Sequence, residues 1–402
     1  MTRSPSSIRA RPAAGFTLVE LLVAATAALA VMAALVSLFG AFSRAVSTGR
    51  ELAQLAGRMR SAGWRLRQDL QGLTTEVKPW VRPDAAAGYF ELVEGPLRDS
   101  GTSAVSDIDD VLMFTTASPG RPFTGLVGGG GFETPVAEVA WFCKASRTGQ
   151  TFNGLPLYDL YRRQLLVSAV PGTGGFPTTN AVAFSSWDAY FLSNDVSCRL
   201  RGGQLLPNGL ADLTARENRF MHNSAGVVGA AAFPYVETFT TASTAADGEI
   251  LTGTREGEDV VLTNVLAFDV RVFNPGLATA AGSAAYGDLG GGATAGSAPL
   301  SGAMNVNATI ATRLGGPQIV TYDTWSMHYE FNGIDEDADG VVDDGSNGID
   351  DNSNNAVDDL AEFETAPPYP VALRGIEVRI RCIEPTSQEV RQVTIQHSFL
   401  AR

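Results

Sequence analysis

The sequence predicts an α+β protein in which a long N-terminal helix packs on antiparallel β-sheet, with long Gly/Ala-rich loops between the strands. Three observations support this class. An unbroken apolar run of 22 residues, Leu21–Phe42, lies near the N-terminus. An amphipathic stretch follows it directly. The remaining chain consists of short segments rich in β-branched and aromatic residues, separated by tracts of small residues.

The first predicted element is one helix from about Phe16 to Leu70, broken at most near Thr48-Gly49. At 1.5 Å per residue the apolar run spans roughly 33 Å, which matches the hydrocarbon core of a bilayer. Beyond it, apolar residues recur at three- and four-residue steps between charged residues, as in an amphipathic helix. We therefore expect 16–43 to form a transmembrane and assembly helix, and 44–72 to continue it against a sheet.

Residues 73–402 are predicted to form a β-rich head. Seven segments have strand character: 110–117, 136–144, 157–169, 264–273, 318–331, 373–385 and 390–400. The last two are joined by Pro385-Thr386-Ser387, which predicts a hairpin. Two tracts of small residues, 125–131 and 276–303, are interpreted as low-complexity connections.

The charge of the chain is concentrated in one place. Of a net charge of −14, twelve acidic residues and no Lys or Arg lie between Asp335 and Glu364, so the rest is close to neutral. This argues against a nucleic-acid partner, because nucleic-acid-binding surfaces are basic. The three cysteines, Cys143, Cys198 and Cys382, show no zinc or CxxC spacing. A Cys143–Cys198 disulfide and three reduced, buried thiols both fit the sequence.

The N-terminal segment contains a single acidic residue in apolar surroundings. Residues 1–15 are short and basic, and the stretch GFTLVELL, which begins at Gly15, carries Glu20. A signal peptide cut near Ala30 explains neither this carboxylate nor the length of the apolar run, and a plain membrane anchor explains only the length. The basic leader with Gly15–Leu22 resembles the processing site of type IV prepilins and of the pseudopilins of type II secretion.

This resemblance implies a pilin-like fold and a defined processing step. The leader 1–15 would be cleaved by a prepilin peptidase between Gly15 and Phe16, and the new N-terminus would be methylated. Glu20 then becomes the fifth residue of the mature chain. Its carboxylate would pair with the Phe16 amine of a neighbouring subunit, because two buried charges that pair cost far less than either alone. Glu20 is therefore expected to be an assembly residue.

The order of parts beyond the helix resembles the J-type pseudopilins and the W-type minor pilins, including a C-terminal hairpin motif from Pro370. The resemblance implies a minor pilin or pseudopilin that assembles with other such subunits in a type II secretion pseudopilus or a type IV pilus. It would be a single-pass inner-membrane protein with a cytoplasmic N-terminus and a periplasmic head before it enters a periplasmic or surface filament. The motifs do not distinguish the two machines, the cargo or the position in the filament.

The sequence leaves two other classes of function open. A calcium-dependent pilus-tip adhesin or binding module is the alternative, and an anchored periplasmic hydrolase is a third class. The histidines His222, His328 and His397 lie in no recognisable catalytic motif, and the glycine-rich tracts lack the lysine and the strand–turn–helix context of a phosphate-binding loop. The sequence therefore predicts a protein that is not an enzyme.

An acidic tandem repeat of 15 residues, 332–346 and 347–361, precedes the C-terminal hairpin. Its first unit follows D-x-D-x-D-G-x-x-D, which resembles the first nine positions of an EF-hand calcium loop, without the bidentate glutamate at position 12 or flanking helices. A solvated acidic loop is the alternative, but twelve uncompensated acids would repel one another without a cation. The predicted Ca²⁺ ligands are Asp335, Asp337, Asp339, the Val341 carbonyl and Asp343 in the first unit, and Asp350, Asn352, Asn354 and Asp358 in the second.

Processing at Gly15 gives a first prediction. Co-expression with a prepilin peptidase should yield a chain that begins at N-methyl-Phe16, and Gly15→Leu should leave the precursor intact because the residue before the cut no longer fits. Ser7→Leu, in the same leader, is the control and should be processed normally. Intact-mass spectrometry reads the N-terminus, and a chain that begins after Ala30 would contradict the prediction.

Overall fold

The computed structural model describes residues 15–95, 97, 107–168, 182–222, 248–273, 286–289, 320–337, 339–365, 367, 369 and 371–400. The leader up to residue 14, Pro370 and most of the 276–303 tract lie outside the described residues. The chain divides into two compact units, Met1–Leu55 and Ala56–Arg402.

The N-terminal element is a single helix of 54 residues, α1 (Leu18–Gln71). The predicted helix is confirmed, and it continues through Thr48-Gly49 without a break. After it, the chain turns at Gly72, where a Cβ atom would lie 2.2 Å from the carbonyl oxygen of Ala117. Only glycine therefore allows the chain to pass this close to the neighbouring strand.

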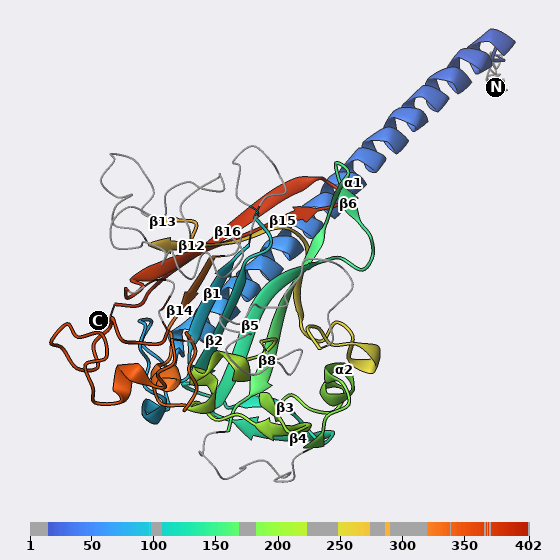
Figure 1. The fold of residues 1–402 in the computed structure, drawn as a ribbon. Helices are drawn as coiled ribbons and strands as arrows, with labels where there is room; N and C mark the ends of the chain where they lie inside the picture. The colour runs from blue at the N-terminus through green and yellow to red at the C-terminus, as the bar shows by residue number, and fades with distance from the viewer. Residues whose placement is uncertain are drawn as a thin grey trace, which may run out of the picture. The chain divides into compact units, whose positions relative to one another are not determined.

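The head is built on a nine-stranded antiparallel sheet (Figure 1). The strand order is β14-β1-β2-β5-β8-β12-β15-β16, and the short β13 pairs with the end of β12. Its strands are β1 (Phe90–Glu94), β2 (Val111–Ala117), β5 (Val136–Ala145), β8 (Tyr158–Leu166), β12 (Val260–Phe273), β13 (Tyr286–Gly287), β14 (Val320–Asp323), β15 (Gly375–Glu384) and β16 (Glu389–Ser398).

Smaller elements complete the described part of the head. They comprise one short helix, two hairpins, a three-stranded sheet of order β10-β11-β9 and several 3-10 turns. The helix is α2 (Trp187–Phe191), and the strands are β3 (Phe123–Val127), β4 (Gly130–Thr134), β6 (Thr151–Phe152), β7 (Leu155–Pro156), β9 (Val182–Ala183), β10 (Cys198–Arg201) and β11 (Gln204–Pro207). The 3-10 turns are η1 (Pro83–Ala85), η2 (Asp212–Thr214), η3 (Arg216–Asn218), η5 (Gly253–Arg255), η7 (Met327–Glu330) and η8 (Asp344–Ser346).

The central strands are buried on both faces. In β5, Trp141 turns toward α1, where its indole N–H donates to Asp69 at 3.0 Å. The next residue, Phe142, lies in the apolar cluster on the opposite face, together with Tyr161 of β8 and Phe191 of α2. Because both faces are covered, β5 is buried almost throughout and lacks the polar alternation of a half-exposed strand.

The sheet is curled, so that residues near its two edges approach each other. Phe90 of β1 contacts Phe399, just beyond β16, with ring centroids 5.2 Å apart. The Tyr322 hydroxyl of β14 donates to the carbonyl oxygen of Val371 at 2.8 Å and accepts the N–H of Leu373 at 3.0 Å. The start of the C-terminal hairpin is thereby fastened to the far edge of the sheet.

Most predicted strand segments are confirmed, including the β15–β16 hairpin with its turn after Glu384. The prediction for 318–331 is wrong beyond Asp323, where β14 ends. The chain then enters η7, because the Ser326 side chain accepts the N–H of His328 and caps a 3-10 turn. His328 consequently lies outside any strand.

The tract 125–131 is not a low-complexity connection. It forms most of the β3–β4 hairpin, whose turn residues Gly128 and Gly129 have φ values of 59° and 81°. A two-residue turn with positive φ at both positions is the tight hairpin turn that glycine favours. The prediction for this tract is wrong because it was based on glycine content and not on turn geometry.

The contact between α1 and the sheet gives a second prediction. Arg162 of β8 donates to both carboxylate oxygens of Asp69 at 2.7 Å, in a buried bidentate pair. Asp69→Ala leaves the guanidinium and the Trp141 N–H without this acceptor and should lower the free energy of unfolding by about 3–5 kcal/mol. The exposed Arg67→Ala, two positions earlier, is the control. Urea unfolding of the full chain in detergent measures both, and equal effects would contradict the prediction.

Candidate functional site

Thr17 and Glu20 cap the start of α1 through reciprocal hydrogen bonds. Glu20 Oε2 accepts the backbone N–H of Thr17 at 2.9 Å and its hydroxyl at 3.0 Å, while Thr17 Oγ1 accepts the N–H of Glu20 at 3.2 Å. This is a capping box. Glu20 therefore has a role within its own chain, which sequence reasoning missed although the T-x-x-E spacing signals it.

The first part of α1 exposes apolar side chains around its whole circumference. All residues from Gly15 to Ser47 are exposed, with exposed fractions of 81% for Phe16 and 67% for Phe42. Among the described residues, α1 is the one helix long and apolar enough to cross a membrane, as an anchor or a signal sequence would. A helix without a polar face needs lipid or other apolar helices around it.

The first acidic unit brings three of the predicted ligands together. Carboxylate oxygens of Asp335, Asp337 and Asp339 lie within 4.8 Å of one another, a spacing that one Ca²⁺ spans with ligand distances of about 2.3–2.6 Å. Asp335 accepts the N–H of Gly340 at 3.0 Å, and Gly340 has a φ of 99°. Asp339 accepts the N–H of Val341 at 2.8 Å. Ligation of Ca²⁺ by the Val341 carbonyl stays a prediction.

Asp343 closes the first unit and is not a member of this trio. Asp358 closes the second unit in the same way. Asp343 accepts the N–H of Gly333 at 3.1 Å, and Asp358 accepts the N–H of Gly348 at 2.8 Å. The same bond thus recurs 15 residues later. The repeat in the sequence is therefore also a repeat in the structure.

The second unit follows the same backbone course with fewer charges. Asp350 accepts the N–H groups of Asn354 and Asn355 at 3.0 and 2.8 Å, and Asn352 also accepts that of Asn354 at 3.0 Å. Amide oxygens replace carboxylates at 352 and 354. Because affinity for Ca²⁺ depends on ligand charge, this unit is the weaker candidate.

Buried glutamates hold both units to the chain that follows. Glu364 accepts the N–H of Glu336 at 2.7 Å and also that of Asp343, and Glu362 accepts the N–H of Asn352 at 3.2 Å. Burial, with a further contribution from Glu364, raises the pKa of Glu336 to about 8. The sequence placed these glutamates just after the repeat but gave no sign that they anchor it.

A closed ion-pair network lies inside the head, between β1, β14 and the turns η2 and η3. Glu91 accepts from Arg216 at 2.6 Å and from Arg219 at 2.7 Å, and Arg219 also donates to Asp323 at 2.8 Å. His222 Nε2 lies 3.1 Å from Glu91. Although burial opposes ionisation, Arg216 and His222 hold the pKa of Glu91 well below its usual range. Two guanidinium groups balance two carboxylates, and the network joins three segments of the head.

Sequence reasoning also missed a second group of acids beside β12, all of which are buried except the half-buried Asp288. Glu94, Asp107, Asp110, Asp269 and Asp288 come from widely separated parts of the chain. The one available signal was the density of aspartates just before β2. Acids from β1 and β12 could not be brought to that place without the topology.

The three cysteines are free thiols, so the Cys143–Cys198 disulfide is not formed. Cys143 lies within β5, whereas Cys198 begins β10 in the small sheet, with its sulfur 2.8 Å from the Tyr190 hydroxyl oxygen. Burial raises the pKa of both Cys198 and Cys382 to about 12. Neither is a reactive thiolate at neutral pH.

Comparisons of the chain with protein-family models, with curated proteins and with solved structures found no match.

Proposed function

We propose that the chain is a minor pilin or pseudopilin, a non-catalytic subunit for the assembly or tip of a type II secretion pseudopilus or a type IV pilus. The observation that carries this proposal is the segment from Phe16 to Ser43. It is continuous helix from Leu18 onward, exposes apolar or small side chains on all sides, and contains one charged residue, Glu20. A helix of this kind suits two environments, a bilayer and a bundle of identical or related helices.

The same helix would serve in the membrane before assembly and in the filament after it. The basic leader favours a cytoplasmic N-terminus, which places the head on the periplasmic side of the inner membrane. A prepilin peptidase is the processing partner, and other pilin-like subunits are the assembly partners. In the filament, neighbouring helices would replace lipid around the apolar surface.

The capping box and the proposed pairing of Glu20 are compatible. Both described capping contacts of the carboxylate use Oε2. The second oxygen, Oε1, is available to the Phe16 amine of a neighbouring subunit. Pairing removes the penalty of an uncompensated carboxylate in apolar surroundings, so it favours assembly and sets the axial register.

The acidic repeat adds a proposed calcium dependence to the head. The grouping of Asp335, Asp337 and Asp339 supports a Ca²⁺ site in the first unit. A cation would offset the repulsion among the acids and close the loop. The second unit, with Asp350 and two asparagines, would bind more weakly.

Glu20→Gln tests the proposed function because glutamine can retain the cap while losing the charge. The variant should insert into the membrane normally but enter filaments about tenfold less than the wild type. Thr17→Ala, which removes the cap and retains the charge, is the matched control and should assemble nearly normally. Incorporation is measured by crosslinking to partner subunits in sheared filaments. Normal assembly of Glu20→Gln would refute the pairing, and failure of Thr17→Ala would show that assembly also requires the cap.

The calcium dependence of the repeat is tested on the full chain in detergent. Millimolar Ca²⁺ should protect the 332–361 segment from proteolysis, and Mg²⁺ should do so much less, because it favours strict octahedral geometry. Asp335→Ala with Asp337→Ala should abolish most of the protection, and Asp350→Ala a smaller part. Asp351→Ala, an exposed acid of the second unit, is the control. Equal cleavage with Ca²⁺ and with a chelator would show that the repeat is a solvated acidic spacer.

A further inference from the structure

The buried acids lie where the edge of β12 passes from one neighbouring strand to the next. β12 pairs with β8 near its start and with β13 at its end. Between these stretches, the residues just before β2 meet its edge. The carbonyl oxygen of Asp107 accepts the N–H of Phe268 at 2.8 Å, and Asp110 Oδ2 accepts the N–H of Val270 at 2.6 Å. The chain entering β2 is thereby fixed against β12.

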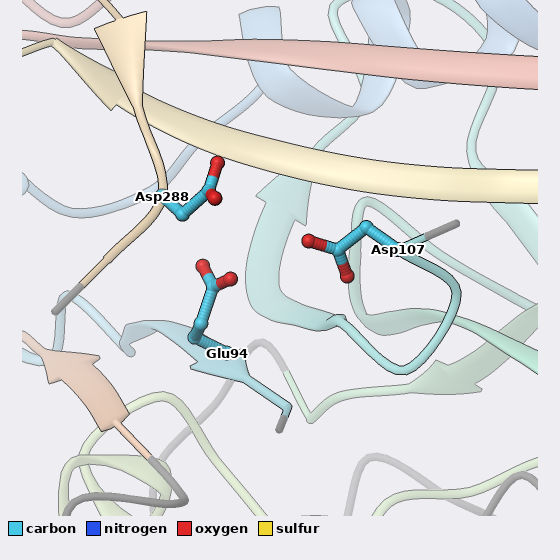
Figure 2. A group of neighbouring side chains, drawn as sticks. All are labelled: Glu94, Asp107 and Asp288. Atoms are coloured by element: carbon cyan, nitrogen blue, oxygen red, sulfur yellow. The ribbon is translucent and has the colours of Figure 1, made fainter. Parts of the chain in front are cut away.

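Five carboxylates converge on this place, in two overlapping groups. Oxygens of Glu94, Asp107 and Asp288 lie within 4.8 Å of one another, and so do oxygens of Asp107, Asp110 and Asp269. Figure 2 shows the first three side chains facing one another from separate segments of the chain. Asp107 is the one residue that belongs to both groups, so its carboxylate lies between the other four.

Asp107 is distinguished by what surrounds its carboxylate. Its side chain is completely buried, and neither oxygen has a hydrogen-bond partner among the described residues. A buried polar group without a partner is costly, and a buried charge is more so. In each of the two groups a carboxylate oxygen of Asp107 lies among the oxygens of other acids instead of facing a donor. This is the arrangement expected of a metal ligand whose metal is its partner.

Two positive charges among the described residues lie at outer members of the group. Arg271 Nε is 3.2 Å from Asp288, and Arg379 Nη1 is 3.9 Å from Asp269. Within the described part of the chain, these two guanidinium groups face five carboxylates.

We propose that these residues form a buried Ca²⁺ site, with Asp107 as the central ligand and Glu94, Asp110, Asp269 and Asp288 around it. All the donors are carboxylate oxygens, which favours a hard cation over zinc or copper. Ca²⁺ accepts six to eight oxygens in flexible geometry, whereas Mg²⁺ keeps several waters and uses one or two carboxylates. The bound ion would join β1 and the entry to β2 to β12 and β13. This site is distinct from the tandem repeat and does not depend on the proposed assembly function.

The experiment first neutralises three predicted ligands of the repeat, so that Ca²⁺ binding to the buried site is measured alone. The full chain carrying Asp335→Asn, Asp337→Asn and Asp350→Asn is purified in detergent and titrated with Ca²⁺ by calorimetry. It should still bind Ca²⁺, and chelation should lower its melting temperature by about 5 °C. Adding Asp107→Asn should abolish both effects. Adding Glu133→Gln, an exposed carboxylate on β4, is the control and should change neither.

The outcomes separate a metal site from a merely structural role. If Asp107 is a metal ligand, the Asp107→Asn variant should be at least as stable as its parent in the presence of chelator, because a buried charge has been removed. It should lose only the stabilisation that Ca²⁺ gives to the parent. Should that variant not fold, Asp288→Asn replaces it and should weaken Ca²⁺ binding at least about tenfold. The proposal is overturned if the repeat-deficient chain binds no Ca²⁺, or if its affinity is unchanged by Asp107→Asn or its replacement.

Discussion

The bidentate ion pair between Asp69 and Arg162 holds the C-terminal part of α1 on the central sheet, and the arrangement of the head depends on it. The pair lies on the middle strands, where the Trp141 indole shares the same carboxylate. With the helix on one face and an apolar cluster on the other, the central strands have little contact with water. Every charged residue on them must therefore find its partner inside the protein.

The head meets this requirement in two different ways. Around Glu91, carboxylates and guanidinium groups are matched within one network, so the chain supplies all the compensating charge itself. Around Asp107, the acids outnumber the bases that reach them from the described residues. One domain thus contains a cluster whose charges are matched and a cluster for which we propose a bound cation.

How far the sequence predicts this protein depends on the range of each interaction. The long helix, the C-terminal hairpin and the acidic repeat were predictable, because each is defined by spacing within a short window. The end of β14 at Asp323 and the β3–β4 hairpin were mispredicted, because local caps and turns outweighed composition there. The spacing of Thr17 and Glu20 predicts the capping box, but the same carboxylate was interpreted only as a charge in a membrane helix.

The long-range sites could not be predicted in this way. Asp107 meets Asp269 only because the residues before β2 occupy a stretch of the β12 edge left open by β8 and β13. Glu364 anchors the first acidic unit from outside the repeat. Such contacts follow from topology, and no periodicity in the sequence encodes them.

The hydrogen bonding of the acidic repeat has an evolutionary consequence. Each unit closes on itself through its own glycine–aspartate bond, and each is anchored by a different glutamate beyond the repeat. No strand of the central sheet passes through the described residues of either unit. Duplication or loss of a whole unit would therefore change the number of acidic turns while leaving strand pairing intact. Homologous chains would tolerate copy-number variation here, in steps of one unit, more readily than insertions of any other length.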